Sequence, residues 1–111
     1  MDLQVETRHE GDTAVVAATG EVDVYTAPAL DAEITGLLQG GSSRLVVDLT
    51  GVSFLDSTGL GVLVKGLKSA RDAGGSMHLV VTSERIRKIF DITGLDASLP
   101  LHDTVDDALA G

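Results

Sequence analysis

The sequence predicts an α/β sandwich: a mixed, mainly parallel β-sheet with an N-terminal hairpin, covered by about four helices. Two observations carry this prediction. The first two strand-like runs are joined by a short polar turn, and the later strand-like runs are followed by segments with helical spacing. Such alternation builds parallel strands connected by helices. A chain of 111 residues supports one hydrophobic core, so we expect a single domain over residues 1–111.

Side-chain alternation predicts the hairpin. Leu3, Val5 and Thr7 share one side of the first run, and the residues between them are polar. Residues 9–12, HEGD, supply turn chemistry, and residues 13–19 are rich in small and β-branched side chains. We therefore expect a half-buried strand paired with the strand that follows it.

A loop and a helix come next. Residues 20–28, GEVDVYTAP, predict a loop that ends at a helix start, with Thr26 as a candidate N-cap and Pro28 in the first turn. Gly40 and Gly41 end the helix. Its predicted core face has residues at i, i+4, i+7 and i+8, namely Leu30, Ile34, Leu37 and Leu38.

The central stretch, RLVVDLTGVSFLDSTGLG over residues 44–61, predicts a strand over residues 45–49 that is covered on both faces. An apolar connector follows, and a helix opens at residues 56–59. The turn at Ser57 is thus expected at the carboxyl end of a central strand, where α/β sheets commonly carry function. The core face of this helix is predicted to contain Leu60, Leu63, Val64, Leu67 and Ala70.

The same helix has two unusual features. Val62 is an apolar residue on the predicted solvent face. Gly59, Gly61 and Gly66 each lower helix propensity by about 1 kcal/mol relative to Ala. These features predict that another group approaches the first turns closely.

The C-terminal third predicts two short strands and two helices. Residues 77–81 form a mostly apolar strand, and Ser83 caps a helix that Gly94 ends. An edge strand is expected at residues 99–101, and Thr104 opens a short last helix.

Composition excludes several partners. The net charge of −9 disfavours nucleic acid and anionic membranes, and a protein is the expected partner. The chain has no cysteine, no apolar window long enough to span a membrane, and no targeting signal at its start, so we expect a cytoplasmic protein. His9, His78 and His102 lie on separate segments without ligand spacing, and we expect no metal and no cofactor.

Ser57 has two interpretations. It is either the N-cap of its helix, or a hydroxyl that accepts a phosphate. A phosphate there would gain free backbone donors and the positive end of the helix dipole.

Three separated motifs resemble anti-sigma factor antagonists of the STAS domain family, with the closest likeness to actinobacterial members. The first is FLDSTGLGVLVKGLKSAR at residues 54–71, with VVDLTGV before it at residues 46–52. The others are GEVDVYTAPAL at residues 20–30 and RIRKIFDITGL at residues 85–95. The resemblance covers nearly the whole chain and implies a single STAS domain.

The resemblance implies a partner-switching phosphoprotein without catalytic activity. Its unmodified form would bind an anti-sigma factor that is also a GHKL-type serine kinase, and so release a sigma factor for transcription, for example in a stress response. The kinase would phosphorylate Ser57, and a PP2C-type phosphatase would reverse this. The protein would be a monomer or weak dimer. The implied partner-binding residues are Asp23, Tyr25, Thr26, Asp56, Thr58, Gly59, Leu60, Gly61 and Val62.

Several alternatives stay open. Residues 23–26 could be an ordinary polar loop with Tyr25 half-buried, and the basic residues at 85, 87 and 88 could be a solvated helix face or a partner-binding site. An enzyme is disfavoured, because Ser57 lacks a Gly-x-Ser-x-Gly setting and the chain has no phosphate-binding GxxxxGK[ST] loop. A rival within the family is a STAS module that regulates a signalling assembly or a transporter.

Overall fold

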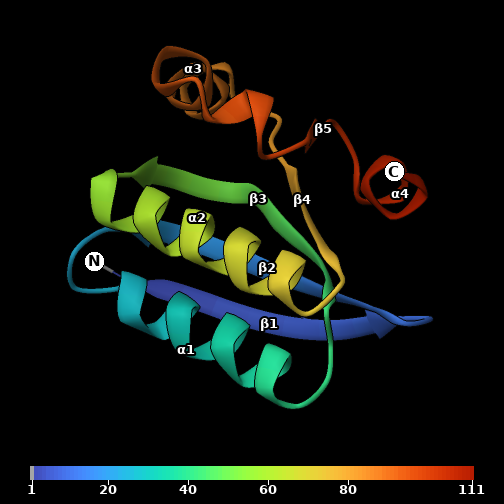
Figure 1. Ribbon diagram of the computed structural model, residues 1–111. Coiled ribbons are helices and arrows are strands. Elements are labelled where there is room, and N and C mark those ends of the chain that lie inside the picture. The colour runs from blue at the N-terminus through green and yellow to red at the C-terminus, as the bar shows by residue number, and fades with distance from the viewer. Residues whose placement is uncertain (1) are drawn as a thin grey trace.

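The computed structural model describes residues 2–111 and has one sheet with helices on both faces (Figure 1). A 3₁₀ turn, η1, spans Leu95–Ala97 between α3 and β5. The strands and helices, in chain order, are β1 (Leu3–Glu10), β2 (Thr13–Val22), α1 (Ala27–Gln39), β3 (Arg44–Leu55), α2 (Ser57–Asp72), β4 (Ser76–Val80), α3 (Glu84–Thr93), β5 (Leu101–His102) and α4 (Val105–Ala110).

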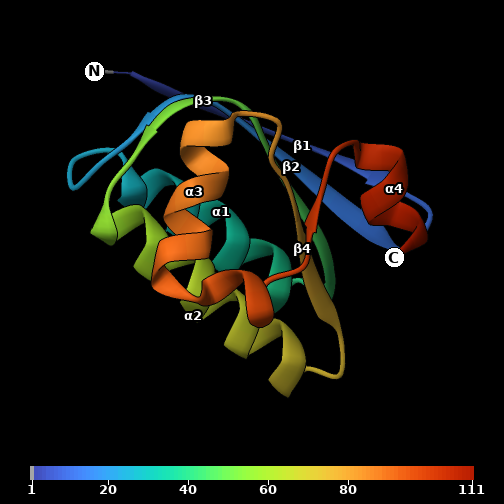
Figure 2. The ribbon, with the colours of Figure 1, turned by 90° about the horizontal axis from the view of Figure 1, so that it is seen from above.

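The sheet confirms the predicted fold class. Its strands lie in the order β1-β2-β3-β4-β5. The hairpin β1–β2 is antiparallel and sits at one side, and the three other pairs are parallel. Helices α1, α2 and α3 pack on one face, and α4 packs on the other (Figure 2). The central strand β3 is thereby covered on both faces, as its continuous apolar run predicts.

The two faces of the sheet build two hydrophobic clusters. Side chains that alternate along a strand point to opposite faces. Val47 and Leu79 therefore belong to the large cluster under α1, α2 and α3. Val46 and Val80 belong to the small cluster under α4, where they meet Ala108.

Strand β3 is longer than the sequence predicts, because the expected connector is part of the strand. The pairing with β2 shifts twice, between Ala17 and Thr19 and again between Gly20 and Glu21, and each shift leaves one extra residue on β3. Such bulges bend a strand and redirect its side chains. Strand β2 also continues to Val22, so residues 20–22 are strand and not loop.

Two glycines of α2 serve internal packing, which corrects the prediction that an outside group requires them. A Cβ on Gly59 would lie 2.5 Å from Leu55 Cδ1 and 2.7 Å from Val22 Cγ1, and one on Gly66 would lie 2.6 Å from Met77 Cε. A Cβ on Gly61 would meet no atom within 4 Å. Only Gly61 is left without a packing reason.

Val62 was expected on the solvent face, and the structure corrects this. The side chain is partly buried and packs against the large cluster. Helix α2 packs against α1 as well as against the sheet. Its buried face is therefore wider than that of a helix that packs on a sheet alone.

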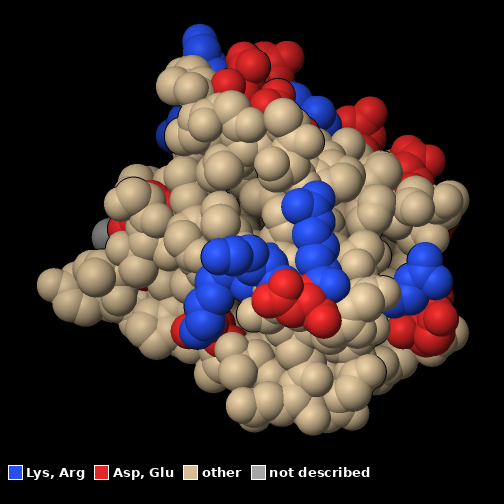
Figure 3. Space-filling view, viewed as in Figure 1, with Lys and Arg blue, Asp and Glu red and all other residues tan. Residues whose placement is uncertain are grey.

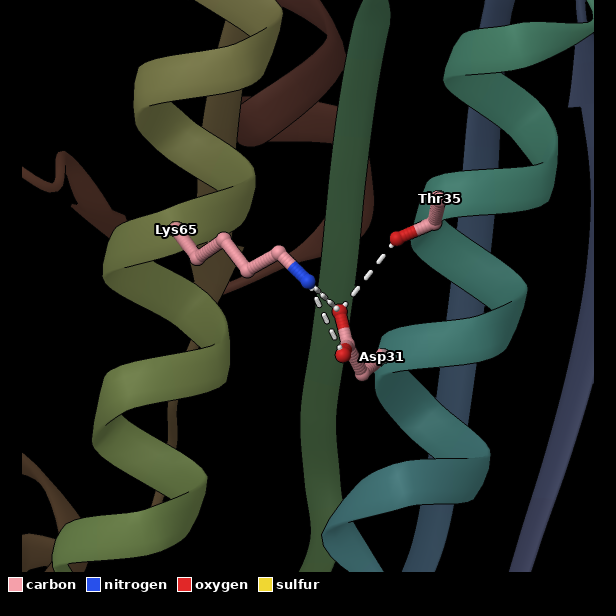
Figure 4. A network of polar contacts seen from close by, with 3 residues as sticks. All are labelled: Asp31, Thr35 and Lys65. Carbon is pink, nitrogen blue, oxygen red and sulfur yellow. Dashed lines mark hydrogen bonds and ion pairs between the residues drawn. The ribbon is translucent and has the colours of Figure 1, made fainter.

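A polar contact joins α1 and α2 across their shared groove (Figure 4). Lys65 Nζ donates to both carboxylate oxygens of Asp31 at 3.0 Å, and Thr35 Oγ1 donates to Asp31 Oδ1 at 3.3 Å. Exposed ion pairs of this kind contribute about 0–1 kcal/mol, so the apolar core and not this contact holds the helices together.

The glycine contacts give a matched pair of stability predictions. Gly59→Ala should lower the free energy of unfolding by about 1–3 kcal/mol, because the new methyl group overlaps two core side chains. Gly61→Ala should raise it by up to about 1 kcal/mol, because the site is open and alanine favours the helix. Urea denaturation measures both. Equal effects of the two substitutions would contradict the packing described.

Candidate functional site

Ser57 is the first residue of α2 and is exposed to solvent. It follows the carboxyl end of β3, the middle strand of the five, as predicted. Within residues 2–111 no hydrogen bond uses its hydroxyl, so the oxygen is available to a reagent from outside.

The N-cap of α2 is Asp56, which removes the alternative that Ser57 is the cap. Asp56 Oδ1 accepts from the N–H groups of Thr58 at 2.9 Å and Gly59 at 3.0 Å, and the Asp56 carbonyl accepts from Leu60 N–H at 3.0 Å. A cap of this kind contributes about 1 kcal/mol. The expectation that these backbone donors are free for a phosphate on Ser57 is therefore wrong for Thr58 and Gly59.

The loop between β2 and α1 is closed by its own hydrogen bonds. Asp23 Oδ1 accepts from the N–H groups of Tyr25 and Thr26, both at 2.9 Å. Thr26 is the residue before α1 but its hydroxyl does not cap the helix; it donates to the Glu21 carbonyl at 2.7 Å and accepts from Asp23 N–H at 2.9 Å. The Thr26 N–H, with that of Tyr25, holds the pKa of Asp23 below its usual 3.8.

The sheet brings this loop and the Ser57 turn together. Strands β2 and β3 are parallel neighbours, and Val22 pairs with Leu55 at the point where both strands end. Asp56 N–H donates to the Val22 carbonyl at 3.2 Å, and Gly59 lies against the Val22 side chain. Two segments that are more than thirty residues apart in sequence therefore form one surface.

That surface exposes several apolar side chains beside the partly buried carboxylates of Asp23 and Asp56. Val24 is 55%, Tyr25 87% and Phe54 48% exposed, three of the four exposed large hydrophobic residues within residues 2–111. Figure 3 shows few charged side chains at the left, where α1 and α2 begin. The alternative of a half-buried Tyr25 is wrong. Exposed apolar groups gathered in one place are typical of protein-binding surfaces.

The predicted partner-binding residues divide by exposure. Tyr25, Thr58 and Gly61 are exposed and can touch another protein directly. Gly59 is buried and acts through packing. The others are partly buried: Asp23, Thr26, Asp56, Leu60 and Val62.

Sequence reasoning missed Phe54 and Val24 as surface groups. Phe54 is exposed next to the second register shift of β3, where Ser53 has no partner on β2, and Val24 is exposed in the loop that follows β2. Glycines within strand-like runs, such as Gly20 and Gly51, are the signal of such a bulge.

A protein-family model for the STAS domain matches residues 4–108. The chain belongs to the STAS domain family. Within this family it falls among the anti-sigma factor antagonists, because it is 41% identical over 95 residues to the anti-sigma-B factor antagonist of Staphylococcus epidermidis. The match covers 86% of this chain and 88% of that protein.

Solved structures show the same STAS architecture. An anti-sigma factor antagonist from Mycobacterium paratuberculosis superposes with a TM-score of 0.91 at 33% identity, over 98% of this chain and 92% of that chain. The phosphorylated form of Bacillus SpoIIAA superposes with a TM-score of 0.74 at 24% identity, over 98% and 97% of the two chains, and shows the shared fold. The closer likeness to actinobacterial members stays a prediction.

Two histidines that were expected to be apart lie together on the α4 face of this STAS domain. His78 Nδ1 is 2.8 Å from His102 Nε2, and the rings stack with centroids 5.0 Å apart. Burial, with the charges of His102 and Arg44, lowers the pKa of His78. The two nitrogens bond each other, and residues 2–111 contain no group of three side chains suited to a metal ion.

No helix within residues 2–111 has the length and apolar character that crossing a bilayer requires.

The Asp23 geometry predicts a pH dependence. A carboxylate whose folded pKa is lowered contributes stability above its unfolded value of 3.8 and loses it as the pH falls through the folded pKa. We expect wild type to be more stable than Asp23→Asn at pH 6, and the difference to shrink as the pH falls below about 4. Urea denaturation between pH 6 and pH 3 measures it. A difference that stays constant over this range would contradict the role of the charge.

Proposed function

We propose that this STAS domain acts by partner switching. The unphosphorylated form binds an anti-sigma factor, which is a GHKL-type serine kinase, and thereby frees a sigma factor in the cytoplasm. The kinase phosphorylates Ser57 and binding is lost; a PP2C-type phosphatase restores it. The observation that carries the proposal is the Ser57 hydroxyl, which is exposed, has no hydrogen bond within residues 2–111, and lies on the same surface as the exposed apolar side chains of Val24, Tyr25 and Phe54.

The identity of the relatives supports the choice of partner. The staphylococcal protein at 41% identity is by name an antagonist of an anti-sigma-B factor. The apolar residues Val24, Tyr25 and Phe54 supply the kind of area that a protein partner buries.

The setting of Ser57 supports a substrate and not an enzyme. A nucleophilic serine requires a base within hydrogen-bond reach, and within residues 2–111 no side chain bonds this hydroxyl. In the proposed reaction the kinase removes the hydroxyl proton, the Ser57 oxygen bonds the γ-phosphorus of ATP, and ADP leaves. The kinase thus supplies both the base and the nucleotide site.

The Asp56 cap supports an outward phosphate. Asp56 already holds the Thr58 and Gly59 N–H groups, so a phosphate on Ser57 cannot take them without displacing a carboxylate. The phosphate adds about −1.5 to −2 charges beside that carboxylate and is repelled toward solvent. The charge therefore lies where the partner docks, and the fold does not need to rearrange.

Charge on Ser57 should control partner binding. Ser57→Ala should hold the anti-sigma factor as tightly as the unmodified protein, because it adds no charge at this position. Ser57→Asp and the phosphorylated protein should bind more than about a hundredfold more weakly, which corresponds to a loss of about 3 kcal/mol. Pull-down from cells of the source organism, followed by titration calorimetry with the captured anti-sigma factor, measures this.

The same material tests the substrate role. With ATP alone the protein should stay unlabelled, and with the captured kinase mass spectrometry should place one phosphate on Ser57. Thr58→Ala removes the neighbouring exposed hydroxyl, and the phosphate should still be found on Ser57, whatever the rate of labelling. Labelling without kinase, or tight binding by Ser57→Asp, would defeat the proposal.

Asp56 should determine what phosphorylation does to stability. Asp56→Asn keeps a capping oxygen but removes the charge beside the phosphate. We expect phosphorylation of Ser57 to stabilise Asp56→Asn more than wild type, by about 1 kcal/mol, because the helix dipole then acts without the opposing repulsion. Thermal unfolding of wild type and Asp56→Asn, each with and without a phosphate on Ser57, measures the difference. An equal effect of phosphate in both backgrounds would contradict the competition.

A further inference from the structure

Helix α3 exposes a stripe that the proposed switch does not use. Arg85, Lys88, Ile89 and Ile92 are spaced at i, i+3, i+4 and i+7, so they share one side of the helix, and we refer to them as the α3 stripe. Ile92 is 74% exposed. The buried side of α3 contains Ile86 and Phe90. Ile89 is partly buried and packs against the large cluster, so Ile92 is the exposed apolar residue of the stripe.

A hollow connects the α3 stripe to the end of β3. It has a volume of about 190 Å³ and is lined by Ser53, Phe54, Leu55, Arg85, Ile86 and Ile89. Its β3 wall is followed directly by Asp56 and then by Ser57. Phe54 is part of this wall, and the surface therefore continues from the Ser57 turn onto α3.

The charge of this surface differs from that of the whole chain. The chain has a net charge of −9, yet Arg85 and Lys88 are exposed and form no salt bridge with any residue from 2 to 111. Arg87, by contrast, bonds the Val81 carbonyl and Asp103 on another side of α3. Lys88 lines a separate hollow together with the carboxylates of Glu84, Asp91 and Asp96, whereas Arg85 lines the hollow against Phe54. An unpaired arginine beside apolar side chains matches a partner segment that is apolar and acidic.

We propose that the α3 stripe and its hollow bind an acidic, amphipathic segment of the anti-sigma factor. The inference rests on the function proposed above. It extends the interface with the anti-sigma factor from the surface around Ser57 onto helix α3. An apolar side chain of this segment fills the hollow against Phe54, and an acidic side chain pairs with Arg85 at its edge. The segment allows the protein to select this anti-sigma factor over other proteins that could dock at Ser57, because those proteins would lack the acidic, amphipathic segment.

Substitutions at exposed positions test the proposal without loss of the fold. Ile92→Ser should weaken binding of the captured anti-sigma factor about tenfold, because an apolar anchor is lost. Arg85→Glu should slow association about fivefold at low salt, and the difference should fade at high salt. Lys68→Glu is the matched control: it makes the same change of charge on an exposed residue about three turns along α2 from Ser57 and should stay within twofold of wild type. Surface plasmon resonance supplies the rates.

Each outcome is decisive. Wild-type binding by both α3 variants, together with release by Ser57→Asp, would overturn this inference and leave the proposed switch intact. Weaker binding by the α3 variants, with no effect of Ser57→Asp, would support the α3 contact and refute the switch. A wild-type dimer that Ile92→Ser converts to a monomer, without change in anti-sigma factor binding, would assign the stripe to self-association and overturn the inference.

Discussion

The carboxylate of Asp56 is the contact on which the functional end of the molecule depends. Its two hydrogen bonds to the Thr58 and Gly59 N–H groups start α2, while the Asp56 N–H is tied to the Val22 carbonyl of the neighbouring strand. The residue between the cap and its donors is Ser57, which is consequently held on the outside, and its hydroxyl has no hydrogen-bond partner within residues 2–111. Because the cap occupies the backbone donors, a phosphate on Ser57 would remain at the surface, where a partner protein meets its charge.

The close packing of α2 on the sheet decides what lies beside that serine. Gly59 allows Val22 and Leu55 to approach the helix within a distance that any side chain would prevent. This contact places the Asp23 loop against the Ser57 turn. The surface is then completed by Tyr25 from the loop and Phe54 from the bulged strand. Because the exposed side chains of this surface include Val24, Tyr25 and Phe54, a single added phosphate is a large local change in its charge.

Much of the fold follows from local sequence. The order of strands and helices, the caps at Ser83 and Thr104, and the left-handed Gly94 at the end of α3 are all predictable, because each depends on residues a few positions apart. The exposed Ser57 at the end of the central strand follows from the same reasoning. The position of the Asp23 loop beside it was implied by a family resemblance, and the pairing of Val22 with Leu55 gives its physical cause.

The sequence by itself thus determined the elements, their order and the serine at the start of α2. The tertiary structure decided the register of β3, the identity of the cap, and the meeting of His78 with His102. These features depend on which backbone donors and which strands are neighbours in space. A hydrogen bond between distant segments changes the direction of a side chain without any signature in the residues beside it, and glycines such as Gly20 and Gly51 indicate a bulge without giving the register that follows.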